Sequence, residues 1–104
     1  MDAKDYQILV DKTLKSIADR VDELDRDDMD IEEGDGKLVI EMDDGTPFII
    51  NRQSAANQIW FAEPGGGWHF NYSDGEWRCD KRKISLFQAL EEALSKKFGS
   101  KVKL

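Results

Sequence analysis

The first part of the chain places its apolar residues with the period of an α-helix. When successive residues are turned by about 100°, one stripe about 100° wide collects the apolar positions. Its members are Tyr6, Val10, Thr13, Leu14, Ile17, Val21 and Leu24. The opposite face is charged and mostly acidic, so this segment is predicted to be a helix that packs on one side only.

After Leu24 the period changes to two, which is typical of strands with one buried and one exposed face. Asp43-Asp44-Gly45 and Ser73-Asp74-Gly75 each predict a tight hairpin, and the glycine run 65–67 predicts a flexible connection. The pattern gives about six short strands, over residues 28–32, 38–42, 46–51, 58–62, 68–72 and 76–79.

A second helix is predicted near the C-terminus. Ser85 and Gln88 have the spacing of a capping box, apolar residues then continue to Phe98, and Gly99 stands where a left-handed residue would end the helix. The order helix, strands, helix predicts an α+β fold. We expect a two-layer sandwich in one domain, 1–104, with an antiparallel sheet covered on one face by the N- and C-terminal helices.

Alternation assigns the strand residues to the two faces of this sheet. The residues expected to face the helices are Phe48, Ile50, Ile59, Phe61, Phe70, Tyr72 and Trp77. The other face stays open and carries Asn51, Gln58, Trp60, His69, Asn71 and Arg78.

Composition narrows the functional classes. The net charge of -7 opposes binding to nucleic acids and to anionic membranes. The single cysteine, Cys79, and the single histidine, His69, exclude an internal disulfide and a thiolate or imidazole zinc site. Residues 1–5 lack the features of a signal or transit peptide, and no apolar run is long enough to span a membrane, so we expect a cytoplasmic protein.

The negative charge is concentrated in one segment. Between Asp19 and Asp35 ten acidic residues stand against Arg20 and Arg26, which gives this segment a net charge of -8. Neighbouring like charges on a helix destabilise it by a few tenths of a kcal/mol per pair. Carboxylate oxygens are hard ligands that suit Ca, Mg, Mn and both oxidation states of iron. Two hypotheses remain open here: a weak cation site, or a solvated acidic face that serves solubility.

Trp60 is the second unusual feature. Because Ile59 and Phe61 are expected to point inward, Trp60 points outward, and a large aromatic residue on a polar sheet face is a common interface anchor. The alternative is that a loop, Arg52 or His69 covers the ring. Cys79 lies two residues from Trp77, so both point to the same side of the strand, and Cys79 is expected to be a small core residue.

The chain resembles the frataxin family, and its bacterial branch in particular. The resemblance rests on residues 48–53 (FIINRQ), 57–62 (NQIWFA) and 66–70 (GGWHF), and it continues through Trp77, residues 86–87 and the acidic first helix. It implies the same helix–sheet–helix fold. It also implies weak iron binding by surface acids and regulation of iron–sulfur cluster assembly through contacts with the cysteine desulfurase and the scaffold protein.

Carried over residue by residue, the resemblance assigns two sites. The metal-binding acids, here called the acidic ridge, are Asp19, Asp22, Glu23, Asp25, Asp27, Asp28, Asp30 and Glu32. The partner-binding residues, here called the Trp60 patch, are Asn51, Gln58, Trp60 and His69. The expected ligand is Fe2+ or Fe3+, with other divalent cations as alternatives, and the expected state without iron is a monomer.

Two other functions compete with regulation. A ferroxidase or iron-storage protein would use the same surface carboxylates to oxidise or hold iron. An acidic decoy protein would need the negative charge but neither Trp60 nor a metal. The Glu-x-x-His pairs of di-iron bundles are missing from the sequence, which favours a regulator that is not an enzyme.

Overall fold

The computed structural model describes residues 1–79 and 81–104. Within these ranges two helices pack against a sheet of seven strands. The helices are α1 (Ala3–Asp22) and α2 (Leu86–Phe98), and a short 3₁₀ turn, η1, spans Ser54–Ala56. The strands are β1 (Met29–Gly34), β2 (Lys37–Met42), β3 (Pro47–Gln53), β4 (Gln58–Glu63), β5 (Gly66–Ser73), β6 (Glu76–Cys79) and β7 (Ile84–Ser85).

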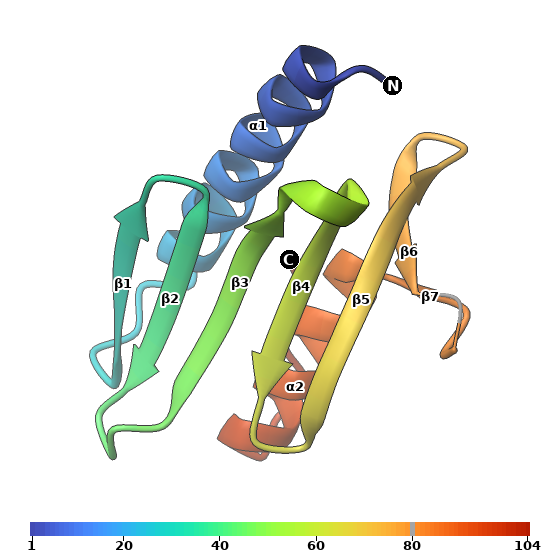
Figure 1. The fold of residues 1–104 in the computed structure, drawn as a ribbon. Helices are drawn as coiled ribbons and strands as arrows, with labels where there is room; N and C mark the ends of the chain where they lie inside the picture. Colours follow the sequence, from blue (N-terminus) through green and yellow to red (C-terminus); the bar gives the residue numbers. More distant parts are fainter. Residues whose placement is uncertain (80) are drawn as a thin grey trace.

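The sheet is an antiparallel meander in which every strand pairs with its neighbour in sequence. Both helices lie on the same side of it, as Figure 1 shows, so the predicted two-layer α+β architecture is confirmed. The strand count exceeds the expected six because β7 has two residues, too few for alternation to reveal. The glycine run was predicted wrongly: Gly66 and Gly67 belong to β5, and Pro64 and Gly65 form a two-residue turn.

The helix ends follow local chemistry. The Asp2 side chain accepts a hydrogen bond from the Asp5 N–H at the start of α1, and Ser85 and Gln88 form the predicted capping box at the start of α2. Gly99 ends α2 at φ +70°. The predicted extension of α1 to Leu24 is wrong, because the helix stops at Asp22 and Asp25 turns the chain at φ +50°.

Neither helix, within the described residues, is long and apolar enough to cross a bilayer.

One hydrophobic core fills the space between the helices and the sheet. It joins the α1 stripe to the inward residues of β2 to β6 and to Leu90 and Leu94 of α2. Cys79 is buried there as expected. Tyr72 departs from its prediction: it packs edge-on against Trp77 but stays 38% exposed, because it lies one residue from the end of β5 at the β5–β6 turn.

The ends of α2 are tied to the rest of the chain by polar contacts. The C-terminal residues run back along α2, where the Val102 N–H donates to Ser95 Oγ and the Leu104 N–H donates to a Glu91 carboxylate oxygen, both at 2.8 Å. Lys97 pairs with Asp44 of the β2–β3 turn at 2.5 Å. This pairing and the Thr46 N–H hold the pKa of the Asp44 carboxyl well below its usual range.

We expect Ser85→Ala to lower the free energy of unfolding by about 1 kcal/mol, because it leaves the Gln88 N–H without its capping acceptor. Urea denaturation monitored by circular dichroism measures the change. Ser100→Ala, at an exposed site beyond the helix, is the control and should stay within about 0.5 kcal/mol. Equal losses in the two variants would contradict a role for the cap.

Candidate functional site

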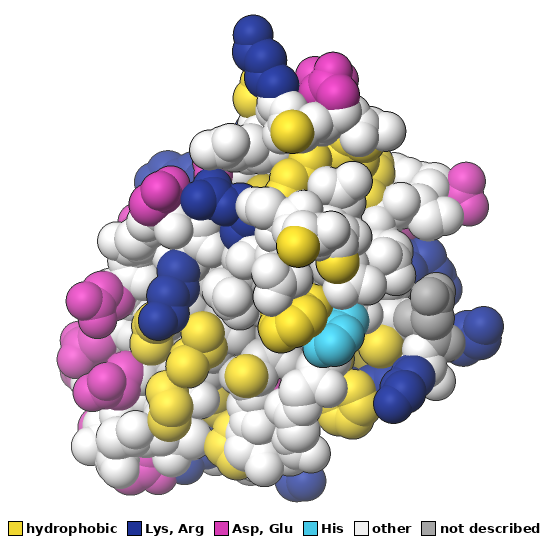
Figure 2. Space-filling model, viewed as in Figure 1, with side chains coloured by type: hydrophobic (Ala, Val, Ile, Leu, Met, Phe, Trp, Pro, Cys, Tyr) yellow, Lys and Arg dark blue, Asp and Glu magenta, His cyan; other side chains and the backbone are white. Residues whose placement is uncertain are grey.

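The acidic ridge follows the chain from the last turns of α1 through the α1–β1 loop into β1. Seven of its eight side chains are exposed, and Asp28 is half-buried. In Figure 2 acidic side chains gather along the left edge of the molecule, where Figure 1 places β1 and the end of α1. The predicted metal-binding residues are thus mostly exposed and belong to consecutive segments of the chain, from the end of α1 to β1.

Two basic residues already engage this ridge. Lys15 Nζ lies 3.1 Å from Asp19 Oδ1, one helical turn away, and this contact raises the pKa of Lys15. Arg26 donates two hydrogen bonds to Asp28, at 2.8 and 2.9 Å, and lowers the pKa of that carboxyl. The same guanidinium lies 3.6 Å from the centre of the Phe98 ring. Asp28 is thus the ridge carboxylate whose orientation is most restricted.

The β1–β2 register adds an acid that the sequence analysis missed. Asp30 stands directly opposite Glu41, and both side chains have the parity of the open face. Directly opposed like charges destabilise a strand pair, and a bound cation relieves that repulsion. The sequence could have revealed this pair, because a two-residue turn at Asp35-Gly36 fixes the register that sets Asp30 opposite Glu41.

The ridge carries oxygen ligands without forming a closed cage. In the part of the chain that the structure describes, no three His, Cys, Asp or Glu side chains are grouped closely enough to hold a metal ion together. Carboxylates on an exposed edge bind hard cations through one or two residues, with water completing the coordination. Such an edge suits weak and exchangeable cation binding.

The Trp60 patch forms on the middle strands of the open face. The register places Asn51 of β3 opposite Trp60 of β4, and Trp60 opposite His69 of β5. The Trp60 and His69 rings stack with centroids 4.2 Å apart and planes 7° from parallel. The indole Nε1–H donates to Gln58 Oε1 at 2.8 Å. All four predicted residues therefore lie together.

The structure bears on both hypotheses for Trp60: the side chain lies on the open face, and His69 covers part of the ring, as the alternative expected. The ring is half-buried against His69, and it lies on the open face rather than in the core. Gln58 is held from the other side, because its Nε2 donates to Asn71 Oδ1 at 3.2 Å. Hydrogen bonds and stacking therefore fix the indole in one orientation before any partner binds.

Apolar neighbours extend the patch beyond the predicted residues. Val39, Ile49 and Ala62 form a cross-strand row beside Asn51 and Trp60, and each is partly or fully exposed. Figure 2 shows hydrophobic side chains and the single histidine in the middle of this face, next to the acidic edge. Strand parity alone would have identified Val39 and Ile49. The open face thus offers an apolar centre with negative charge along one edge.

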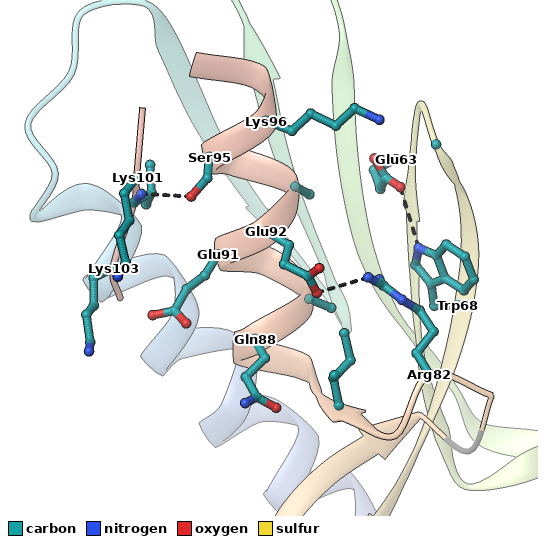
Figure 3. A pocket seen from close by; sticks show the side chains of 15 residues that line it. Glu63, Trp68, Arg82, Gln88, Glu91, Glu92, Ser95, Lys96, Lys101 and Lys103 are labelled. Carbon is teal, nitrogen blue, oxygen red and sulfur yellow. Dashed lines mark hydrogen bonds and ion pairs between the residues drawn. The ribbon is translucent and has the colours of Figure 1, made fainter. Parts of the chain in front are cut away.

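A groove of about 950 Å³ lies on the other side of the molecule, between α2, the β4–β5 turn and the C-terminal residues. Figure 3 shows that Arg82 points to Glu92 and that Trp68 points to Glu63 in this groove. Arg82 pairs with Glu92 at 2.9 Å and lies 4.7 Å from the Trp68 ring centre, and Trp68 donates to Glu63. None of the predicted site residues lines this groove.

Comparisons with known proteins agree with this geometry. Residues 1–100 match the family model of the frataxin-like domain. The chain is 38% identical over 96 residues to the iron-sulfur cluster assembly protein CyaY of Vibrio cholerae serotype O1, covering 92% of this chain and 91% of that protein.

Two solved structures share the fold. Frataxin from Psychromonas ingrahamii superposes with a TM-score of 0.90 at 27% identity, over 99% of this chain and 97% of that one. Trimeric frataxin from the yeast Saccharomyces cerevisiae, complexed with ferrous iron, gives 0.76 at 29% identity, over 88% and 86% of the two chains.

We expect Arg26→Gln to strengthen cation binding to the ridge, because it releases both Asp28 oxygens and returns the pKa of that carboxyl towards its usual value. An NMR titration with a divalent cation should show an affinity gain of about threefold to tenfold. Arg20→Gln makes the same change in net charge at a guanidinium that lies over Phe87 and pairs with no ridge acid in the described structure. A matching gain in that control would mean that net charge, not Asp28, sets the affinity.

Proposed function

The chain belongs to the frataxin family, and we propose on this basis that it regulates iron–sulfur cluster assembly in the bacterial cytoplasm. The observation that carries the proposal is the pairing of two unlike surfaces on one sheet. The acidic ridge lies at one edge, and the Trp60 patch lies in the middle of the open face. Each surface suits a different partner.

The ridge is proposed to dock on a basic surface of the cysteine desulfurase. The segment 19–35, which contains the ridge, has a net charge of -8 that would steer the encounter over a long range. The same carboxylates would bind Fe2+ or Fe3+ weakly, as exchangeable cargo or as a signal. Iron on the ridge would neutralise part of its charge and so change the docking, which gives a physical route from iron concentration to cluster assembly.

The Trp60 patch is proposed to contact the scaffold protein. A tryptophan that is fixed in place beside the apolar row of Val39, Ile49 and Ala62 has the composition of an interface centre. The indole is already oriented by Gln58 and His69, so binding would require little further loss of side-chain freedom. A protein that touches both partners at once can alter how they meet.

We propose that the chain is not an enzyme. The ridge carboxylates are exposed to water, whereas di-iron oxidation uses ligands buried inside a bundle. An acidic decoy would gain nothing from an oriented Trp60. The regulator therefore accounts for both surfaces, and each competing function accounts for one.

We expect Asp19→Lys combined with Asp22→Lys to weaken desulfurase binding by at least about tenfold, because the change puts positive charge against a basic surface. Asn at both positions should give an intermediate loss. Wild-type affinity should also fall steeply with salt, as the screening length shortens from about 10 Å at 0.1 M to about 3 Å at 1 M. Calorimetric or surface-based titration measures each affinity.

The matched control reverses two acids of the β5–β6 hairpin, several strands away from β1, by Asp74→Lys with Glu76→Lys, which changes the net charge equally. Desulfurase affinity should then stay near the wild-type value. If the control behaves like the ridge variant, or if salt has no effect, the ridge is not the docking surface and the solvated-face hypothesis is preferred.

We expect Trp60→Ala to weaken scaffold binding by about 2 kcal/mol while changing the free energy of unfolding by less than about 1 kcal/mol. Its neighbour Phe61 points to the opposite face and is 1% exposed, so Phe61→Ala should destabilise the fold by about 3 kcal/mol or more. Pull-down and denaturation experiments on both variants separate the two effects. A large loss of stability in Trp60→Ala would show that the Trp60 side chain serves the fold, which contradicts the prediction.

A further inference from the structure

We propose that Tyr6 of α1 is the positioning residue of the Trp60 patch. The inference rests on the proposed function in one respect, namely that the patch binds a partner. Its structural part depends only on contacts within this chain. It connects the helix that carries part of the acidic ridge to the open face of the sheet, on the far side of the core.

The Tyr6 hydroxyl is inserted at the end of the β3–β4 ladder. It donates to the Gln58 carbonyl oxygen at 2.5 Å and accepts from the Gln53 N–H at 3.1 Å. Gln53 and Gln58 are the last pair of that ladder. The hydroxyl therefore bridges the two strand ends as a bound water would, but it is fixed by a side chain from another element.

The connection between these strands needs such a bridge. It consists of η1 and Asn57, which adopts φ +53° in the left-handed region. Non-glycine residues occupy this region at an energetic penalty, which is smaller for asparagine than for most. The described side chains of η1 are not buried, so they give the turn little packing. The Tyr6 ring, in contrast, is 2% exposed and packs edge-on against Trp77, which makes it a rigid support.

Gln58 connects the Tyr6 hydroxyl to the Trp60 patch through two hydrogen bonds. The backbone carbonyl of Gln58 accepts from Tyr6, and the side chain of the same residue accepts from the Trp60 indole. A shift of this strand end would move Gln58 Oε1 away from Trp60 Nε1. The indole would then lose the hydrogen bond that fixes its orientation on His69.

The test is Tyr6→Phe, which keeps the ring and removes the bridge. The three tryptophans supply internal references, because each indole donates to a different acceptor: Trp60 to Gln58, Trp68 to Glu63 and Trp77 to Thr13. In a ¹H–¹⁵N NMR spectrum we expect the Trp60 indole resonance to shift and broaden, with hydrogen exchange about threefold to tenfold faster. The Trp68 resonance should stay in place, and the Trp77 resonance should shift less than that of Trp60, because the Tyr6 ring that packs edge-on against Trp77 is retained in phenylalanine.

Thr13→Val is the matched control on the same helix. It removes a hydroxyl that accepts from Trp77 and is part of neither the turn nor the patch. It should lower stability comparably and move the Trp77 resonance while leaving Trp60 unchanged. If Tyr6→Phe loses stability but leaves the Trp60 resonance and its exchange rate at wild-type values, Tyr6 serves folding alone and the proposal is overturned.

Two further measurements link the spectrum to binding. Tyr6→Phe should weaken scaffold binding by about threefold to tenfold. Adding it to Gln58→Ala should weaken binding no further, because Tyr6 acts through Gln58. Fully additive losses would overturn the proposal. If the wild-type chain does not bind a scaffold protein, the proposed function fails, and the Trp60 resonance still decides the role of Tyr6.

Discussion

The burial of one face of the sheet under α1 and α2 holds every other feature of the molecule in place. The inward residues of β2 to β6 and the apolar sides of both helices form a single core. Since a strand presents alternate residues to its two faces, covering one face commits the other to solvent. The Trp60 patch is therefore a consequence of the same alternation that builds the core.

The core also allows a concentration of charge that would destabilise an isolated helix. The ridge acids of α1 lie away from its buried stripe, so they repel one another without disturbing the packing of the helix on the core. Lys15 and Arg26 offset only part of it. Most of the negative potential remains at the surface, where it can attract cations or a basic protein surface.

The two candidate surfaces are not independent parts of the molecule. Helix α1 presents Asp19 and Asp22 to solvent near its C-terminal end, and near its N-terminal end it places Tyr6 against the β3–β4 turn. A rigid helix anchored in the core thus meets both surfaces.

The sequence by itself determined the layers of the fold, the ends of α2, the parity of the strand residues and the acidic character of one segment. These features follow from local periods, from capping residues and from charge, all of which are read within a few positions. It also identified Trp60 as outward-facing, because Ile59 and Phe61 on either side of it are apolar.

Only the tertiary structure decided which of these residues meet. It stacked His69 on Trp60, placed Arg26 between Asp28 and Phe98, and brought Tyr6 to Gln53 and Gln58. The last contact joins residues 52 positions apart. Such pairings leave no periodic trace in the chain, because they depend on how the helix is rotated and seated on the sheet. Packing of the whole core sets that rotation, and no local residue preference specifies it.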